Sequence, residues 1–107
     1  MARVIAISSD LLLGSKVEAM LRAAGHEVTM ASSPDPGQLD SANLIVADLD
    51  TENATALVGH GAPVLGYYSH VNPETKQAAE TAGVDLAVPR SRMARELPEL
   101  ATKLLEG

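Results

Sequence analysis

The stretch Leu44-Ile45-Val46-Ala47-Asp48-Leu49-Asp50 decides the fold of this chain of 107 residues. Its first part is a continuous apolar run of strand length, which is typical of a strand buried on both faces of a parallel sheet. The run ends abruptly at the carboxylate of Asp48. In open α/β sheets the carboxyl edge of the strands is where ligands bind and chemistry occurs. The stretch therefore predicts a buried strand and makes Asp48 the leading candidate for a functional residue.

The remainder of the chain alternates apolar runs with segments of helical periodicity. Strands are predicted at residues 4–7, 26–31, 44–47, 63–68 and 84–88. Asp10 is a good N-cap for the first helix, and Gly25 is placed to end it. Asn72-Pro73 predicts the start of a later helix, and Gly83 its end. Pro98 falls in the last helical segment, where a proline is tolerated if it lies in the opening turn.

The middle of the chain leaves little room for helices. Residues 32–37 are rich in helix breakers, and residues 51–58 allow only a short helix before Gly59-His60-Gly61. Alternating elements with short connections predict an α/β fold, the flavodoxin-like doubly wound five-stranded parallel sheet with strand order 2-1-3-4-5. We expect shortened second and third helices, and a single domain that spans residues 1–107.

Composition excludes several functional classes. The 14 acidic and 8 basic residues give a net charge of −6, which argues against nucleic acid or an anionic membrane as a partner. The chain has no cysteine, hence no thiol nucleophile or cysteine-ligated metal. No apolar stretch is typical of a signal peptide or a transmembrane helix, so we expect a cytoplasmic protein.

Taken in order, these segments resemble the receiver domain of two-component response regulators. The resemblance covers most of the chain and is carried by residues 3–10, 23–28, 43–48, 63–65 and 82–85. It implies that Asp48 stands at the phosphate-accepting position. It also implies that the metal-binding acidic pair of the family falls on Ser8 and Ser9, while Asp10 matches a third acid sometimes present there. With Asp50, these residues would form the loops at the switch point of the sheet.

Two further family positions are altered. The hydroxyl residue after the fourth strand would be Tyr68 or Ser69, depending on where that strand ends. The Lys-Pro pair after the fifth strand is replaced by Val88-Pro89-Arg90, with Arg90 closest to the lysine position. Because Ser8 and Ser9 are neutral, the metal site would lack about two charges that a hard cation such as Mg²⁺ prefers in its ligands.

These departures predict an atypical, pseudo-receiver-like signalling module rather than an enzyme. We expect it to act through a protein partner, without phosphorylation and without a cofactor. Asp48 would then be an acid at a strand end that accepts hydrogen bonds from loop amides. The alternative is a phosphorylatable response regulator receiver, which would accept phosphate on Asp48 with Mg²⁺ and take a histidine kinase as its partner.

The short middle helices also predict a thinly covered face of the sheet. Strand alternation puts Tyr67 and Tyr68 on opposite faces, one in the core and the other exposed as a contact. We expect the thin face, or the edge near these tyrosines, to be closed by a partner protein or by self-association as a homodimer.

Overall fold

Five parallel strands in the order β2-β1-β3-β4-β5 form the centre of the fold. The structure is a computed structural model that describes residues 2–69 and 73–107. Its strands are β1 (Arg3–Ile7), β2 (Glu27–Ala31), β3 (Leu44–Asp48), β4 (Val64–Tyr68) and β5 (Leu86–Pro89). The predicted fold class and strand order are confirmed. The fifth strand begins at Leu86 rather than at the predicted Val84, and β3 includes Asp48.

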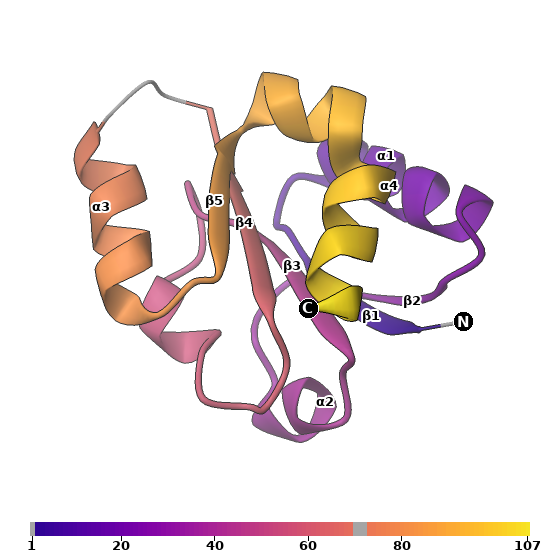
Figure 1. Ribbon diagram of the computed structural model, residues 1–107, viewed down its shortest axis with the longest axis horizontal. Helices are drawn as coiled ribbons and strands as arrows, with labels where there is room; N and C mark the ends of the chain where they lie inside the picture. Colours follow the sequence, from indigo (N-terminus) through magenta and orange to yellow (C-terminus); the bar gives the residue numbers. More distant parts are fainter. Residues whose placement is uncertain (1, 70–72) are drawn as a thin grey trace.

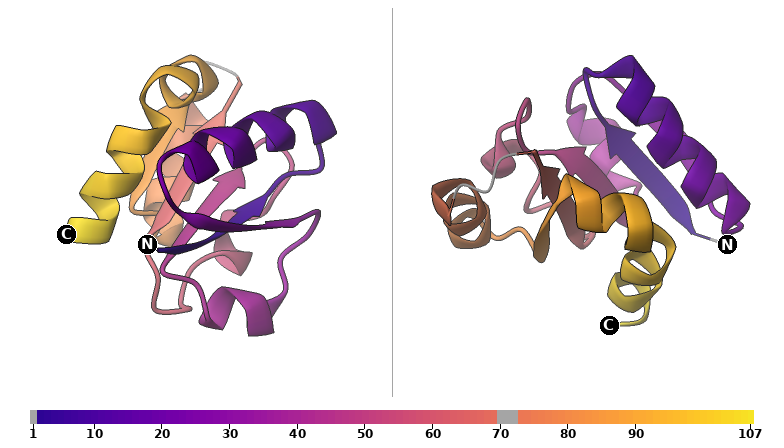
Figure 2. Two further views of the ribbon diagram at one scale, coloured as in Figure 1. Left: turned by 90° about the vertical axis from the view of Figure 1, so that its right-hand side faces the viewer. Right: turned by 90° about the horizontal axis from the view of Figure 1, so that it is seen from above.

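Helices cover both faces of this sheet. They are α1 (Leu11–Ala23), α2 (Pro36–Asp40), α3 (Pro73–Ala82) and α4 (Arg90–Glu106), with a single 3-10 turn, η1 (Ala54–Ala56). Figure 1 shows α1 and α4 on one side of the strands and α3 on the other, and Figure 2 shows α1 beside α4. Within residues 2–69 and 73–107, no helix has the length and apolar character needed to cross a membrane.

Local sequence signals explain where the helices begin and end. Asp10 accepts hydrogen bonds at one carboxylate oxygen from the amides of Leu12 and Leu13, both at 3.1 Å, and so caps α1 as predicted. Gly25 and Gly83 follow α1 and α3 with φ of +93° and +109°, a backbone conformation that glycine adopts without strain. The predicted cap Asn72 lies outside the described residues, and Pro73 is the first described residue of α3.

Pro98 does not meet the condition under which a proline is readily tolerated in a helix. Helix α4 begins at Arg90, so Pro98 lies in its interior rather than in its opening turn. Proline has no amide proton to donate to the carbonyl of Ala94, and its ring crowds that carbonyl. In Figure 1 the axis of α4 changes direction between its orange opening turns and its yellow remainder. We attribute this bend to Pro98.

The core has two layers, one on each face of the sheet. Alternate strand residues point to opposite faces, so each strand contributes to both layers. The layer under α1 and α4 contains Val46, Tyr67 and Leu97, whereas the layer under α2, η1 and α3 contains Ile45, Tyr68 and Leu57. The first and last helices therefore share one face of the sheet.

The prediction of a thinly covered face was wrong. Every residue of β3 and β4 is buried, and the exposed fractions of Tyr67 and Tyr68 are only 1% and 6%. Residues 51–58 form no α-helix, yet the segment after β3 covers the sheet with its own side chains. The Leu49 side chain lies directly over Gly66, where an added Cβ would come within 2.5 Å of Leu49 Cδ1. Neither tyrosine is an exposed contact.

This contact predicts that Gly66→Ala is destabilising. The added methyl group must displace Leu49, and overpacking of this kind costs about 1–3 kcal/mol of the free energy of unfolding. Urea denaturation followed by far-ultraviolet circular dichroism measures the loss. In a double-mutant cycle with Leu49→Ala, the two losses should sum to more than the loss of the double variant.

Gly14→Ala is the matched control. An added Cβ at Gly14 would lie 3.1 Å from the flexible end of Met30 and at an ordinary contact distance of 3.8 Å from Ser8 Cβ. Gly14 lies within α1, where alanine has the higher helix propensity. We expect this variant to be as stable as the wild type or more stable. A neutral Gly66→Ala variant would show that Leu49 moves aside freely.

An ion pair joins the loop after η1 to the end of α2. His60 Nδ1 lies 2.7 Å from a carboxylate oxygen of Asp40, the last residue of α2. The hydrogen bond to Asp40 is the main cause that raises the pKa of His60 above its usual 6.5. The charged imidazolium is therefore favoured in the folded state.

The pair predicts a pH-dependent stability near neutrality. A histidine whose pKa is raised by folding stabilises the protein fully below pH 6.5, and this contribution is lost as the pH rises through the folded-state pKa. Denaturation midpoints of the wild type should fall across this range. His60→Gln should flatten the profile, and an unchanged slope in this variant would assign the effect to another group.

Candidate functional site

The candidate site lies where the carboxyl ends of β1, β3 and β4 meet. Strand alternation brings Ser8, Asp48 and Tyr67 to the face that α1 and α4 cover, in line with Ala6, Val46 and Leu65. Asp48 and Tyr67 are direct partners in the parallel register of β3 and β4. Because the strands lie in register, residues distant in sequence become neighbours at one edge of the sheet.

Asp48 is a buried carboxylate with a local partner. Its exposed fraction is 3%, and one carboxylate oxygen accepts the amide of Asp50 at 2.9 Å. Burial is the main cause that raises its pKa, and the charges of Asp50 and Asp10 act in the same direction. The Asp50 amide and the charge of Arg90 lower the pKa but do not cancel the effect of burial. The predicted hydrogen bond from a loop amide is present.

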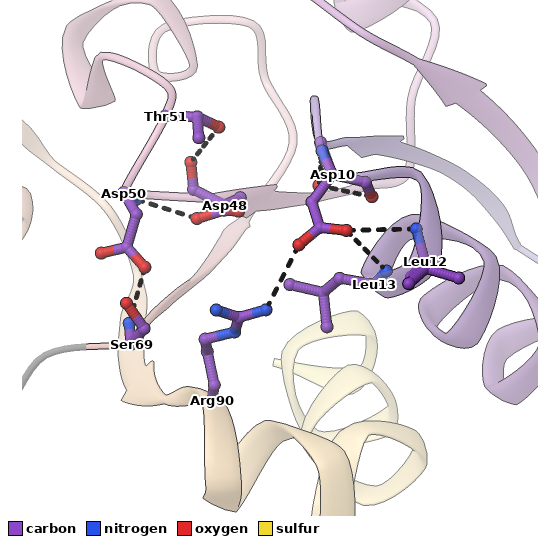
Figure 3. Close-up of polar contacts among 9 residues, drawn as sticks. Asp10, Leu12, Leu13, Asp48, Asp50, Thr51, Ser69 and Arg90 are labelled. Atoms are coloured by element: carbon purple, nitrogen blue, oxygen red, sulfur yellow. Dashed lines mark hydrogen bonds and ion pairs between the residues drawn. The ribbon is translucent and has the colours of Figure 1, made fainter.

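Asp50 turns away from Asp48 toward the end of β4. A carboxylate oxygen of Asp50 accepts a hydrogen bond of 2.7 Å from the backbone amide of Ser69 (Figure 3). The strand β4 ends at Tyr68, so Ser69 is the first residue after it and is exposed. Tyr68 lies in the core of the opposite face. Of the two candidates for the hydroxyl position, only Ser69 is at this edge outside the core.

Asp10 is engaged on both carboxylate oxygens. One oxygen caps α1, and the other lies 3.6 Å from Nη2 of Arg90 at the start of α4, as Figure 3 shows. Ser8 lies beneath this turn; its hydroxyl oxygen accepts the Asp10 amide at 3.1 Å and donates to the Asp10 carbonyl at 3.3 Å. Ser8 thus satisfies backbone groups of the turn, while Ser9 is exposed.

Arg90 is the cation that reaches the site from the predicted lysine position. It bridges the start of α4 to the start of α1 through Asp10, and its charge acts on Asp48. The two neighbouring arginines make contacts within α4 instead. Arg92 lies 3.5 Å from Glu96, and Arg95 donates to the carbonyl of Ser91. Only the first of these three basic residues is therefore part of the site.

Tyr67 is the site residue that sequence reasoning missed. Burial is the main cause that raises the pKa of its phenol to about 12, and the Ser8 side chain acts in the opposite direction. The charge of Asp48 also acts on this phenol. Strand alternation could have placed Tyr67 beneath the site, because it has the same phase as Asp48 once the register of β3 and β4 is known. The sequence alone does not give that register.

The polar groups at this edge do not fit a magnesium site. Mg²⁺ prefers several hard anionic oxygens in octahedral geometry. Ser8 is neutral and already bonded, Asp10 is divided between its helix and Arg90, and Asp50 is bonded to Ser69. Across residues 2–69 and 73–107, no group of three or more His, Cys, Asp or Glu side chains is arranged to hold a metal ion.

The fold is that of receiver domains. A CheY-like receiver domain protein from Methanospirillum hungatei JF-1 matches with a TM-score of 0.80 and 18% identity, over 99% of this chain and 94% of that one. Chemotaxis protein CheY4 of Vibrio cholerae matches with a TM-score of 0.79 and 20% identity, over 97% and 98%. A putative pilus assembly-related protein from Burkholderia pseudomallei K96243 matches with a TM-score of 0.81 and 16% identity, over 99% and 90%. No protein-family model and no curated protein matches the sequence.

The raised pKa of Asp48 predicts how its replacement changes stability. Between pH 3.8 and the higher folded-state pKa, the folded protein binds more protons than the unfolded chain, so stability falls as the pH rises through this window. Asp48→Asn keeps the acceptor for the Asp50 amide and removes the buried charge. Its denaturation midpoint should exceed that of the wild type at pH 7, and the difference should shrink toward pH 3.8.

Asp35→Asn is the matched control, since Asp35 is an exposed cap of α2 whose acceptor role asparagine preserves. This variant should follow the wild-type profile. An Asp48→Asn variant that is less stable than the wild type at pH 7 would show that Arg90 stabilises the carboxylate more than burial destabilises it.

Proposed function

We propose that this chain is a receiver-like signalling module that acts by protein–protein contact and does not use phosphorylation of Asp48. The carrying observation is the surroundings of Asp48: Asp10 and Asp50 are bonded to other residues, and Ser8 is neutral and bonded to the turn. The proposal includes neither catalysis nor a bound cofactor. It places the module in the cytoplasm, with neither nucleic acid nor membrane as its partner.

The chemistry of phosphoryl transfer supports this proposal. A carboxylate must be ionised to accept a phosphoryl group, and the negative charge on the transferring oxygens needs stabilisation by cations or hydrogen-bond donors. Burial acts against the ionised form of Asp48. Among residues 2–69 and 73–107, Arg90 is the cation at this edge, and it is paired with Asp10. The described part of the edge therefore offers little free positive charge to an incoming phosphate.

The start of α1 supports a role in protein contact. The large apolar side chains left exposed among the described residues are Leu11 and Leu12, at 85% and 87%. Leu11 also lines a cavity of about 250 Å³ whose other lining residues include Gly14, Met30 and Ala31. Exposed apolar groups of this kind are buried in protein interfaces. The net charge of −6 favours a partner whose own surface is not acidic.

The test is exposure to acetyl phosphate and, separately, to beryllofluoride, each with and without Mg²⁺. We expect no Mg²⁺-dependent mass increase with acetyl phosphate and no Mg²⁺-dependent shift of backbone amide resonances with beryllofluoride. The reason is that the donor set at Asp48 lacks the anionic oxygens that would hold the cation. A receiver domain with an intact acidic pair serves as the positive control for both reagents.

Asp48→Asn is the matched variant. An Mg²⁺-dependent adduct that forms on the wild type and is absent from this variant would overturn the proposal. It would instead support the phosphorylatable receiver with a histidine kinase as its partner. An adduct that persists in the variant would lie at another residue and would leave Asp48 unphosphorylated, as proposed.

A further inference from the structure

The strand β2 lies at one edge of the sheet and leaves part of its backbone unpaired. Among the described strands its one neighbour is β1. The Glu27 amide and the Ala31 carbonyl bond to the residues that flank β1, at 2.9 and 3.1 Å. Backbone groups alternate in direction along a strand, so those of Val28 and Met30 point away from the sheet. An open edge of this kind pairs with another extended segment.

Arg22 occupies one end of this open edge. Its Nη2 donates to the Val28 carbonyl at 2.8 Å, and its Nε donates to a Glu18 carboxylate oxygen at 3.0 Å. The guanidinium thus holds a carbonyl that a pairing strand would otherwise use. Within residues 2–69 and 73–107, no hydrogen bond reaches the outward N–H or C=O of Met30. The free part of the edge is therefore centred on Met30.

A cavity of about 250 Å³ lies beside Met30, between the end of β2 and α1. Helical spacing places one stripe of α1 along one wall, and Met30 and the two residues after it form the other. The exposed fraction of Leu11, at the mouth of this groove, is 85%. A strand added at Met30 would have this partly apolar cavity directly beside it. The lining residues on α1 are Leu11, Gly14, Ser15 and Glu18.

The charge around this groove is acidic. Asp10 and Glu18 line the cavity, and their side chains remain 46% and 34% exposed although each is paired with an arginine. Glu27 of β2 is exposed as well. A second copy of the chain, with its own net charge of −6, would bring like charges together at this edge. A segment with basic residues would instead be attracted.

We propose that the groove between β2 and α1 is a docking site for an extended segment of a partner protein, in which an apolar residue lies between basic ones. The segment pairs with the backbone of Met30, places its apolar side chain in the cavity, and brings its basic side chains near Asp10 and Glu18. Arg22 limits the length of the pairing by holding the Val28 carbonyl. The inference rests on the proposed function, because it names the class of partner for that protein contact.

The probe is the N-acetylated and C-amidated peptide Lys-Thr-Thr-Leu-Thr-Thr-Lys, titrated into the isotopically labelled protein and followed by NMR. Threonine favours an extended conformation, and the symmetric sequence suits parallel or antiparallel pairing. We expect the amide resonances of Val28 and Met30 to shift and to saturate. The resonances of β5, the strand at the other edge of the sheet, are the internal control and should not move.

Arg22→Ala tests the open edge. It frees the Val28 carbonyl, so the peptide should bind about fivefold more tightly, the effect of one added hydrogen bond of typical net strength. Arg92→Ala is the matched control, because Arg92 is likewise paired with a glutamate four residues away, but on α4. This variant has the same net charge as Arg22→Ala and should keep the wild-type affinity.

Ser15→Phe tests the cavity. Ser15 is an exposed lining residue, and a phenylalanine there should fill the cavity and weaken binding about tenfold, the effect of leaving the leucine of the peptide unburied. Ala19→Phe places the same ring at an exposed position of α1 outside the lining and should leave the affinity unchanged.

Absence of a saturable shift at Val28 and Met30, in both the wild type and Arg22→Ala, would overturn the inference. Equal shifts on β5 would do the same. If Arg22→Ala dimerised without peptide in sedimentation equilibrium and showed these shifts, the occupant would be a second copy rather than a basic segment. None of these results touches Asp48, so the proposed function would stand. An Mg²⁺-dependent beryllofluoride adduct would instead refute the proposed function and leave peptide binding at the groove unaffected.

Discussion

Burial of the parallel sheet on both faces is the constraint on which the rest of this structure depends. A parallel sheet cannot leave a face in water, and this chain has only one short helix and one 3-10 turn between β2 and β4. Individual side chains therefore cover this face of the sheet in place of a helix. Leu49 lies on Gly66, Leu57 is fully buried, and Tyr68 fills the same layer. A small residue at position 66 is the condition for this arrangement.

The opposite face determines the chemistry of the candidate site. Large apolar residues of α1 and α4 pack over the strands, and Tyr67 extends this core up to the level of Asp48. The carboxylate therefore lies in a largely apolar surrounding, which raises its pKa. Where a metal would need anionic oxygens, the chain has Ser8, which is neutral and holds backbone groups of the turn. The site is organised as a set of structural hydrogen bonds.

The sequence predicted the elements with strong local signals and failed where long-range packing decides. Asp10 and Gly25 mark the ends of α1 by chemistry that acts within a few residues, so they could be identified from the sequence. The position of Pro98 depends on where α4 begins, and the burial of Tyr67 and Tyr68 depends on residues distant in the chain. The gathering of Ser8, Asp48 and Tyr67 at one edge of the sheet requires the register of three strands, which periodicity does not provide.

The segment after β3, which covers one face of the sheet, also holds Asp48 in place. The Leu49 amide donates to the Tyr67 carbonyl at 2.8 Å, and its side chain lies on Gly66. The amide of the next residue, Asp50, donates to the Asp48 carboxylate, and the Asp50 carboxylate accepts the Ser69 amide. An Asp48 that reorganised around a new ligand would have to release this segment from β4. Because the same residues exclude water from the sheet, such a movement would expose the apolar layer that includes Tyr68. The absence of an α-helix from residues 51–58 and the fixed position of Asp48 thus follow from the same packing.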